Sequence, residues 1–142
     1  MKIRRAEKGD LKEIAEIFKN ESNKKPYFQG WTEKTAHKKI INLFKEDEIY
    51  VSLVNEKIVG FIITKLNRRK NEFYIDELWL RNTQQGKGIG SALLKYVEDL
   101  YSHKGVSTVT VMAHQKARAM DFYKKSKFKE KHTYVYLTKR IR

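Results

Sequence analysis

The chain has 142 residues, of which 40% are hydrophobic, so it can bury a proper core. It contains no cysteine, which excludes disulfides and thiolate chemistry, and no apolar run approaches the ~20 residues of a membrane span. The formal net charge of +14 points to anionic partners or, equally, to a lysine-rich proteome, because the basic residues are scattered.

The chain begins with a predicted strand followed by an amphipathic helix. Ile3 to Arg5 is the strand candidate, and because no signal-peptide core accompanies it we expect a cytoplasmic protein. Asp10 is the expected N-cap of the helix, with Glu13 as its capping-box partner. Apolar residues then recur at helical spacing to about Asn20.

A loop and a second helix come next. Residues 23–30 contain the only proline and two aromatic residues, Tyr27 and Phe28. These aromatic side chains suit either a wall of a substrate site or a small surface cluster, and the surface cluster is the favoured interpretation. Thr32 is the predicted cap of the second helix, which has an inward apolar face.

Three strands joined by tight turns predict an antiparallel sheet. The first runs from Ile49 to Val54, and Asn55-Glu56 reverses the chain into the second, Lys57 to Leu66. A charged turn leads to the third of these strands, Glu72 to Leu80.

A glycine-rich segment, Gln85 to Ser91, lies between this strand and a helix that ends near Leu100. Its glycines let a ligand approach the backbone, and the amides that begin a helix are unpaired and lie at the positive end of its dipole. The segment therefore predicts a cradle for a phosphate-like anion. The Walker and dinucleotide-binding patterns both fail, because Ser91 stands where the first needs Gly and the second Gly or Ala.

The C-terminal third predicts a strand, a short helix and a closing strand. These are Ser107 to Met112, Ala117 to Lys125, and a region whose clearest part is Thr133 to Leu137. The complete order predicts an α+β sandwich in a single domain, residues 1–142. We expect a mixed, mostly antiparallel sheet of about six or seven strands flanked by about four helices.

This order, with Gln-x-x-Gly-x-Gly after the fourth strand, resembles the GNAT superfamily of N-acetyltransferases over essentially the whole chain. The segment Leu78 to Ser91 looks like the family's acetyl-CoA motif, and Ala119 to Phe128 looks like its Ala-x-x-x-Tyr-x-x-x-Gly-Phe segment. There are two departures. Lys116 replaces the Asn that usually stands seven residues before Tyr123, and Lys127 replaces the Gly before the final Phe.

The resemblance implies that the protein binds acetyl-CoA and uses no metal. The diphosphate would lie on the loop amides, and the pantetheine arm would pair with the edge of the preceding strand. The implied cofactor-binding residues are Leu78, Trp79, Leu80, Gln85, Gly86, Lys87, Gly88, Ile89, Gly90, Ser91, Lys116 and Tyr123.

The resemblance also implies direct attack of an amine on the thioester, without a covalent enzyme intermediate. Asp76 and Glu77 are the candidate bases, and they face opposite sides of the strand unless a bulge intervenes. Glu77 is slightly favoured, because it is nearer the point where the family's strand splays. Tyr123 matches the family's general acid, and His114 is a weaker candidate for proton transfer.

The alternative is a catalytically inactive protein of this fold that binds RNA, a protein partner or acetyl-CoA as a sensor. Nucleic acid is not the favoured partner, because no RNA-binding motif accompanies the basic residues, and a homodimer is left open. The acceptor stays open among small amines, amino acid derivatives, aminoglycoside-like compounds and protein N-termini. The charge of +14 argues against a free polyamine.

Overall fold

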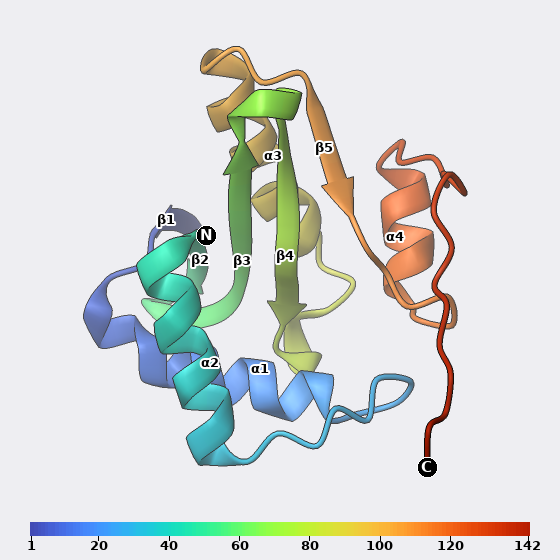
Figure 1. The fold of residues 1–142 in the computed structure, drawn as a ribbon. Coiled ribbons are helices and arrows are strands. Elements are labelled where there is room, and N and C mark those ends of the chain that lie inside the picture. Colours follow the sequence, from blue (N-terminus) through green and yellow to red (C-terminus); the bar gives the residue numbers. More distant parts are fainter.

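A computed structural model describes residues 1–142 and contains one five-stranded sheet with four α-helices (Figure 1). The strands are β1 (Lys2–Arg5), β2 (Glu48–Val54), β3 (Lys57–Asn67), β4 (Glu72–Leu80) and β5 (Thr108–Val111). The helices are α1 (Leu11–Ser22), α2 (Glu33–Glu46), α3 (Ile89–His103) and α4 (Ala119–Lys125). None of the helices is both long enough and apolar enough to cross a membrane.

The sheet order is β1-β2-β3-β4-β5, so the strands lie side by side in the order of the sequence. The first four are antiparallel to their neighbours, whereas β5 is parallel to β4. The predicted α+β class and mixed, mostly antiparallel sheet are confirmed. The strand count is five, fewer than the predicted six or seven.

Helices cover both faces of the sheet. Figure 1 shows α1 and α2 in front of the sheet, α3 behind it, and α4 beyond the β5 edge. β3 is buried on both faces: Phe61 and Ile63 pack toward α1 and α2, while Ile62 packs toward α3. Each of these side chains contributes roughly 1.5–3 kcal/mol by leaving water. Double-sided burial explains why β3 reads as an unbroken apolar run.

The predicted turn and helix caps are confirmed at some positions and not at others. Thr32 caps α2 as predicted, accepting a hydrogen bond from the Thr35 amide at 3.1 Å. Asn55 and Glu56 form the predicted tight turn with φ of 50° and 62°, which is the left-handed geometry of a two-residue hairpin. Asp10 occupies the predicted N-cap position of the first helix, but its side chain makes no cap hydrogen bond to that helix.

A competing ion pair explains the position of Asp10. Its carboxylate accepts hydrogen bonds from the Arg4 guanidinium and the Glu7 amide, each at 2.7 Å, so the side chain closes the 3-10 turn that precedes α1. The hydrogen bond from Arg4 lowers the pKa of Asp10. Glu13 therefore has no capping-box role and instead lies 3.7 Å from Arg81.

The predicted closing strand is also wrong. Residues 133–137 form no strand, and their large side chains are exposed, with Tyr136 at 92% and Leu137 at 86%. The alternating pattern encodes strand propensity, but a strand also needs an edge to pair with. Figure 1 shows the chain running past α4 after its last turn instead of returning to β5.

Candidate active site

The two strands at the end of the sheet separate midway. β4 pairs with β5 only from Glu72 to Ile75, whereas it pairs with β3 along its full length to Leu80. Past Ile75, the β4 edge that faces β5 has no strand partner. The expected splay is therefore present, and it leaves a wedge whose wall is open backbone.

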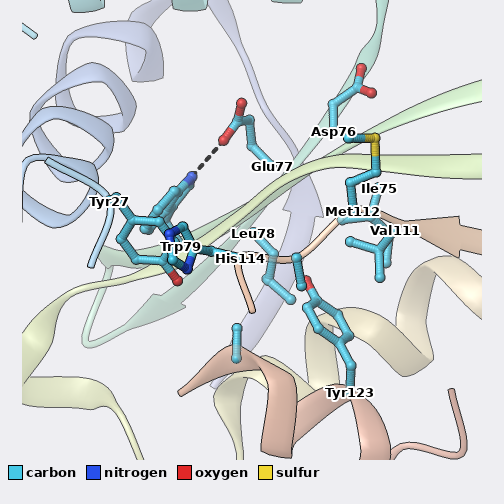
Figure 2. Close-up of a pocket in the computed structure, with 12 residues that line it drawn as sticks. Tyr27, Ile75, Asp76, Glu77, Leu78, Trp79, Val111, Met112, His114 and Tyr123 are labelled. Carbon is cyan, nitrogen blue, oxygen red and sulfur yellow. Dashed lines mark hydrogen bonds between the residues drawn. The ribbon is translucent and has the colours of Figure 1, made fainter. Parts of the chain in front are cut away.

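A β-bulge sets the orientation of the two acids on β4. Ile75 pairs with Thr64 and Glu77 pairs with Ile63, so Asp76 is the extra residue between them. The bulge resolves the alternative that the sequence left open, because Glu77 now shares a face with its cross-strand neighbour Ile63, toward α1 and α2. Figure 2 shows both carboxylates on the same side of β4.

A pocket of about 70 Å³ lies in the wedge (Figure 2). It is formed by β4, the segment after β5, the loop between α1 and α2, and α4. The lining residues are Tyr27, Ile75, Asp76, Glu77, Leu78, Trp79, Val111, Met112, Ala113, His114, Ala119 and Tyr123. The wedge thus brings together all three predicted catalytic residues.

Tyr27 belongs to the pocket wall, contrary to the favoured surface-cluster interpretation. Its ring packs edge-on against Trp79 with centroids 4.8 Å apart, and against His114 at 6.0 Å. Its neighbour Phe28 is 66% exposed and does fit the surface interpretation. The sequence signal was an aromatic residue in the loop before the second helix, and only the fold places that loop over β4.

Glu77 is held in the pocket by a hydrogen bond that the sequence did not indicate. The Trp79 indole Nε1 donates to Glu77 Oε1 at 2.7 Å, shown as the dashed line in Figure 2. Burial raises the pKa of Glu77; the Trp79 hydrogen bond and the charge of Lys39 oppose this, and Asp76 reinforces it. A carboxylate with a raised pKa is better matched to accepting a proton from an ammonium group near neutral pH.

Tyr123 approaches the wedge from α4. It is only 7% exposed, and its ring lies between Phe122 and Phe128 at centroid distances of 5.1 and 5.2 Å. Its hydroxyl makes no hydrogen bond within the protein and, in Figure 2, is directed toward β4. Burial raises the pKa of Tyr123, so the hydroxyl is protonated at neutral pH and can act as a hydrogen-bond donor.

The glycine loop presents free backbone donors next to the wedge. The amides from Gly86 to Ser91 donate no hydrogen bond to any backbone carbonyl, and the last three of these residues begin α3. Gly86 and Gly88 have φ of 78° and 81°, and a Cβ at either would meet nothing within 4 Å. Gly90 differs, because its Cβ position would contact Phe122 at 3.5 Å. The loop therefore has the open donors that a diphosphate needs.

Two further residues predicted to bind the cofactor, Gln85 and Lys116, make other contacts in the structure. The Gln85 side chain folds back, its Nε2 lying 3.4 Å from both the Leu80 carbonyl and Glu21 Oε1, so it braces the loop. Lys116 is exposed outside the pocket, and its amide donates to His114 Nδ1 at 3.0 Å.

One acid near the site went unnoticed in the sequence. Asp47, directly after α2, is buried close to the Asp76 carboxylate. No sequence signal could have found it, because Asp47 and Asp76 are far apart in the chain. They meet only through the register of β2, β3 and β4.

Comparison with known proteins adds a family and a fold. The sequence profile of the acetyltransferase (GNAT) family matches residues 12–128. A search of curated protein sequences finds no match. Solved structures of the same fold include a possible acetyltransferase from Clostridium difficile 630, with 18% identity, coverage of 99% of this chain and 98% of that chain, and a TM-score of 0.82.

Two other structures of this fold have ligands bound. An aminoglycoside acetyltransferase, meta-AAC0020 from an uncultured soil metagenomic sample, in complex with sisomicin, is 23% identical over 98% of this chain and 96% of that one, with a TM-score of 0.72. AAC(6')-Iy, in complex with the bisubstrate analogue CoA-S-monomethyl-acetylneamine, is 11% identical over 98% and 97%, with a TM-score of 0.77. At these identities the likeness establishes the fold.

Proposed function

The chain belongs to the acetyltransferase (GNAT) family, and on this premise we propose that it transfers the acetyl group of acetyl-CoA to a primary amine in a ternary complex. The observation that carries the proposal is the wedge between β4 and β5, which has Glu77 and Tyr123 on its walls and opens next to the free amides of the glycine loop. These are the parts that acetyl transfer requires, in one place.

The residues present fit acetyl-CoA. The amides from Gly86 to Ser91 would hold the diphosphate, with the positive end of the α3 dipole behind them. The open β4 edge from Leu78 to Leu80 would pair with the amides of the pantetheine arm as an added strand would. Bound acetyl-CoA supplies a thioester, whose carbon is the electrophile.

The two titratable side chains would divide the proton transfers. Glu77 would take a proton from the acceptor ammonium, directly or through one water, leaving a neutral amine. The amine nitrogen forms a bond to the thioester carbon, and the carbon–sulfur bond then breaks. Tyr123 would give its hydroxyl proton to the departing thiolate and regain one from solvent. Each proton has a source and a destination, and no covalent enzyme intermediate is needed.

A turnover assay tests the proposal. Purified protein with acetyl-CoA is offered a panel of amines that includes alkylamines, amino acid derivatives, aminoglycosides and peptide N-termini, and release of free CoA is followed. We expect acceptor-dependent CoA release that is strongly reduced in Tyr123→Phe. Tight acetyl-CoA binding with no turnover across the whole panel would instead favour the alternative, a sensor of acetyl-CoA.

A further inference from the structure

The chain ends in a segment that makes no hydrogen bond to the rest of the protein. The Phe128 amide donates to the Tyr123 carbonyl at 3.0 Å, but residues 129–142 take part in no backbone hydrogen bond and belong to no helix or strand. Every residue of this segment, which we call the arm, is exposed. Figure 1 shows the arm running past α4 to the C-terminus. The fold therefore leaves the backbone and the side chains of the arm open to a partner.

Half of the net charge of the protein is concentrated in and beside the arm. Residues 124–142 contain eight Lys or Arg and one Glu, a net charge of +7 out of +14. The basic residues interpreted as scattered are therefore those of residues 1–123, which carry the other half. Lys124, Lys125 and Lys127 lie at the end of α4, and the other five lie in the arm.

The fold does not neutralise this charge. All eight Lys and Arg side chains are exposed, and none of them forms an ion pair. The one contact between titratable groups in the arm joins His132 Nε2 and Glu130 Oε2 at 3.9 Å. Eight unpaired cations so close together in the chain suit a partner that carries many negative charges.

Two tyrosines stand among the cations of the arm. Tyr134 is 87% exposed and Tyr136 is 92% exposed, so neither ring is covered by the protein. In an extended chain, side chains two residues apart lie on the same face, roughly 7 Å from each other. The bases of a single-stranded nucleic acid stack on exposed aromatic rings, while Lys and Arg bind its phosphates. The arm supplies both kinds of side chain.

An anionic membrane and a duplex fit the arm less well. The exposed side chains of Val135, Leu137 and Ile141 suit a lipid surface. The backbone groups of the arm have no hydrogen-bond partners, however, and moving such groups among acyl chains is strongly unfavourable. In a duplex the bases are stacked on one another, so their faces are not free to contact tyrosine.

We propose that residues 124–142 form a binding surface for single-stranded nucleic acid, with the Lys and Arg side chains on phosphates and with Tyr134 and Tyr136 stacked on bases. RNA and DNA share this chemistry, because each nucleotide of either offers a phosphate and a base face. Such binding needs no sequence motif, and the lack of one was the sequence-based argument against nucleic acid. The inference is independent of the proposed acetyl transfer, since none of these residues lines the pocket.

The number of cations sets the expected salt dependence. Each phosphate that is neutralised on a single strand contributes about −0.7 to the slope of log K against the logarithm of the salt concentration. Contacts from about half to all of the eight cations give a slope of about −3 to −6. At physiological salt we expect a Kd of about 1–100 µM, the range of binding that is not specific for sequence.

Fluorescence anisotropy with the full chain tests the role of the two tyrosines. The probes are labelled oligouridylate and oligothymidylate of about twelve nucleotides, and the duplex of the same oligouridylate with oligoadenylate. We expect the double variant Tyr134→Leu/Tyr136→Leu, which keeps the charge and the apolar character, to bind both single strands about tenfold more weakly or less tightly still. Its affinity for the duplex, which depends on charge alone, should equal that of wild type.

A matched pair of charge variants tests the role of the arm. Lys139→Ala/Arg140→Ala removes two cations from the arm and should make the salt slope shallower by about 1.4. Lys34→Ala/Lys38→Ala removes two exposed lysines of α2 that form no ion pair, so the net charge falls by the same amount while the slope stays unchanged. Because the arm is exposed along its whole length, its variants should keep the thermal stability of wild type.

Three results would overturn the proposal. Single-strand affinity that is unchanged in Tyr134→Leu/Tyr136→Leu would show that the rings do not stack on bases. An equal change of slope in the α2 variant would show that only the net charge acts. Sedimentation of the protein with vesicles that contain phosphatidylserine, without binding to either oligonucleotide, would assign the arm to a membrane surface instead.

Discussion

The substitution Asp47→Asn should make the protein more stable at alkaline pH and leave it almost unchanged in acid. Asn has nearly the same shape as Asp, so the packing around the end of α2 is kept and only the ionisable group is removed. Asp47 is 7% exposed and its oxygens lack partners, so ionisation in the folded state is opposed mainly by burial.

The sign and the size follow from the two pKa values. Unfolded, Asp47 titrates near its ordinary 3.8; folded, it titrates at about 7. Between these values the folded state holds an extra proton, so stability is highest below about pH 4 and falls as the pH rises through 7. At 1.36 kcal/mol per pKa unit the full displacement sets an upper bound of about 4 kcal/mol, and solvent screening at the exposed Asp76 carboxylate reduces the loss below that bound. Replacing Asp47 by Asn removes the ionisable group, so the variant does not lose this stability as the pH rises.

Urea unfolding at a series of pH values from about 4 to 8.5 measures this difference, because all other titrating groups are common to the two proteins. We expect the free energy of unfolding of Asp47→Asn to exceed that of wild type by roughly 1–3 kcal/mol above pH 8, with the difference becoming small near pH 4. Asp76→Asn should give a smaller change of the same sign, since Asp76 is the second cause of the raised pKa. A difference between Asp47→Asn and wild type that is constant across the pH range would refute the reasoning.

Four other results are expected. Gly88→Asp should weaken CoA binding in calorimetry far more than Gly88→Asn; both strain the backbone at φ of 81°, but only Asp adds a negative charge at the diphosphate site. Tyr123→Phe should lower kcat by about 10²-fold where chemistry limits the rate, because only the hydroxyl is lost; wild-type kcat would return Tyr123 to a packing role. In pH–rate profiles, Glu77→Gln should shift activity to higher pH and Asp76→Asn should not; the reverse result would make Asp76 the base and contradict the assignment of Glu77. Lys127→Gly should stabilise the fold by roughly 1 kcal/mol in urea unfolding, because Lys127 has φ of 75° at the end of α4; a destabilised variant would show that its side chain contributes more than the strain removes.

Patterns within a few neighbouring residues predicted most of the fold. The predictions that failed depend on contacts between residues that are far apart in the chain. The turn at Asn55-Glu56 and the cap at Thr32 were readable because each is formed within a few residues. The Asp10 side chain makes no cap hydrogen bond because Arg4, on a different element, binds its carboxylate. The strand predicted at residues 133–137 is absent, because alternating polar and apolar residues show only that a strand can form. They do not show that a sheet edge is available to pair with it.

The site residues show the same contrast between local patterns and long-range contacts. The glycine loop was predicted from its spacing between a strand and a helix, and Tyr123 from the resemblance of its segment to a family motif, because both lie in contiguous stretches of sequence. The orientation of Glu77 could not, since a single bulged residue reverses it, and the bulge is a property of the β3–β4 register. Asp47 could not be found at all, because only the folded sheet brings it to Asp76.

The order of strands in the sheet also has a kinetic consequence. Strands β1 to β4 neighbour one another and β2 to β4 are joined by short turns, so their pairing closes small loops and can form early. β5 reaches β4 only after the chain has built residues 81–107, including all of α3, and it then pairs over a few residues. We therefore expect the wedge to lie between a part of the chain that folds early and a part that folds late. A long substrate that touches both sides of the wedge would act as a clamp, holding together the part of the molecule that opens most readily.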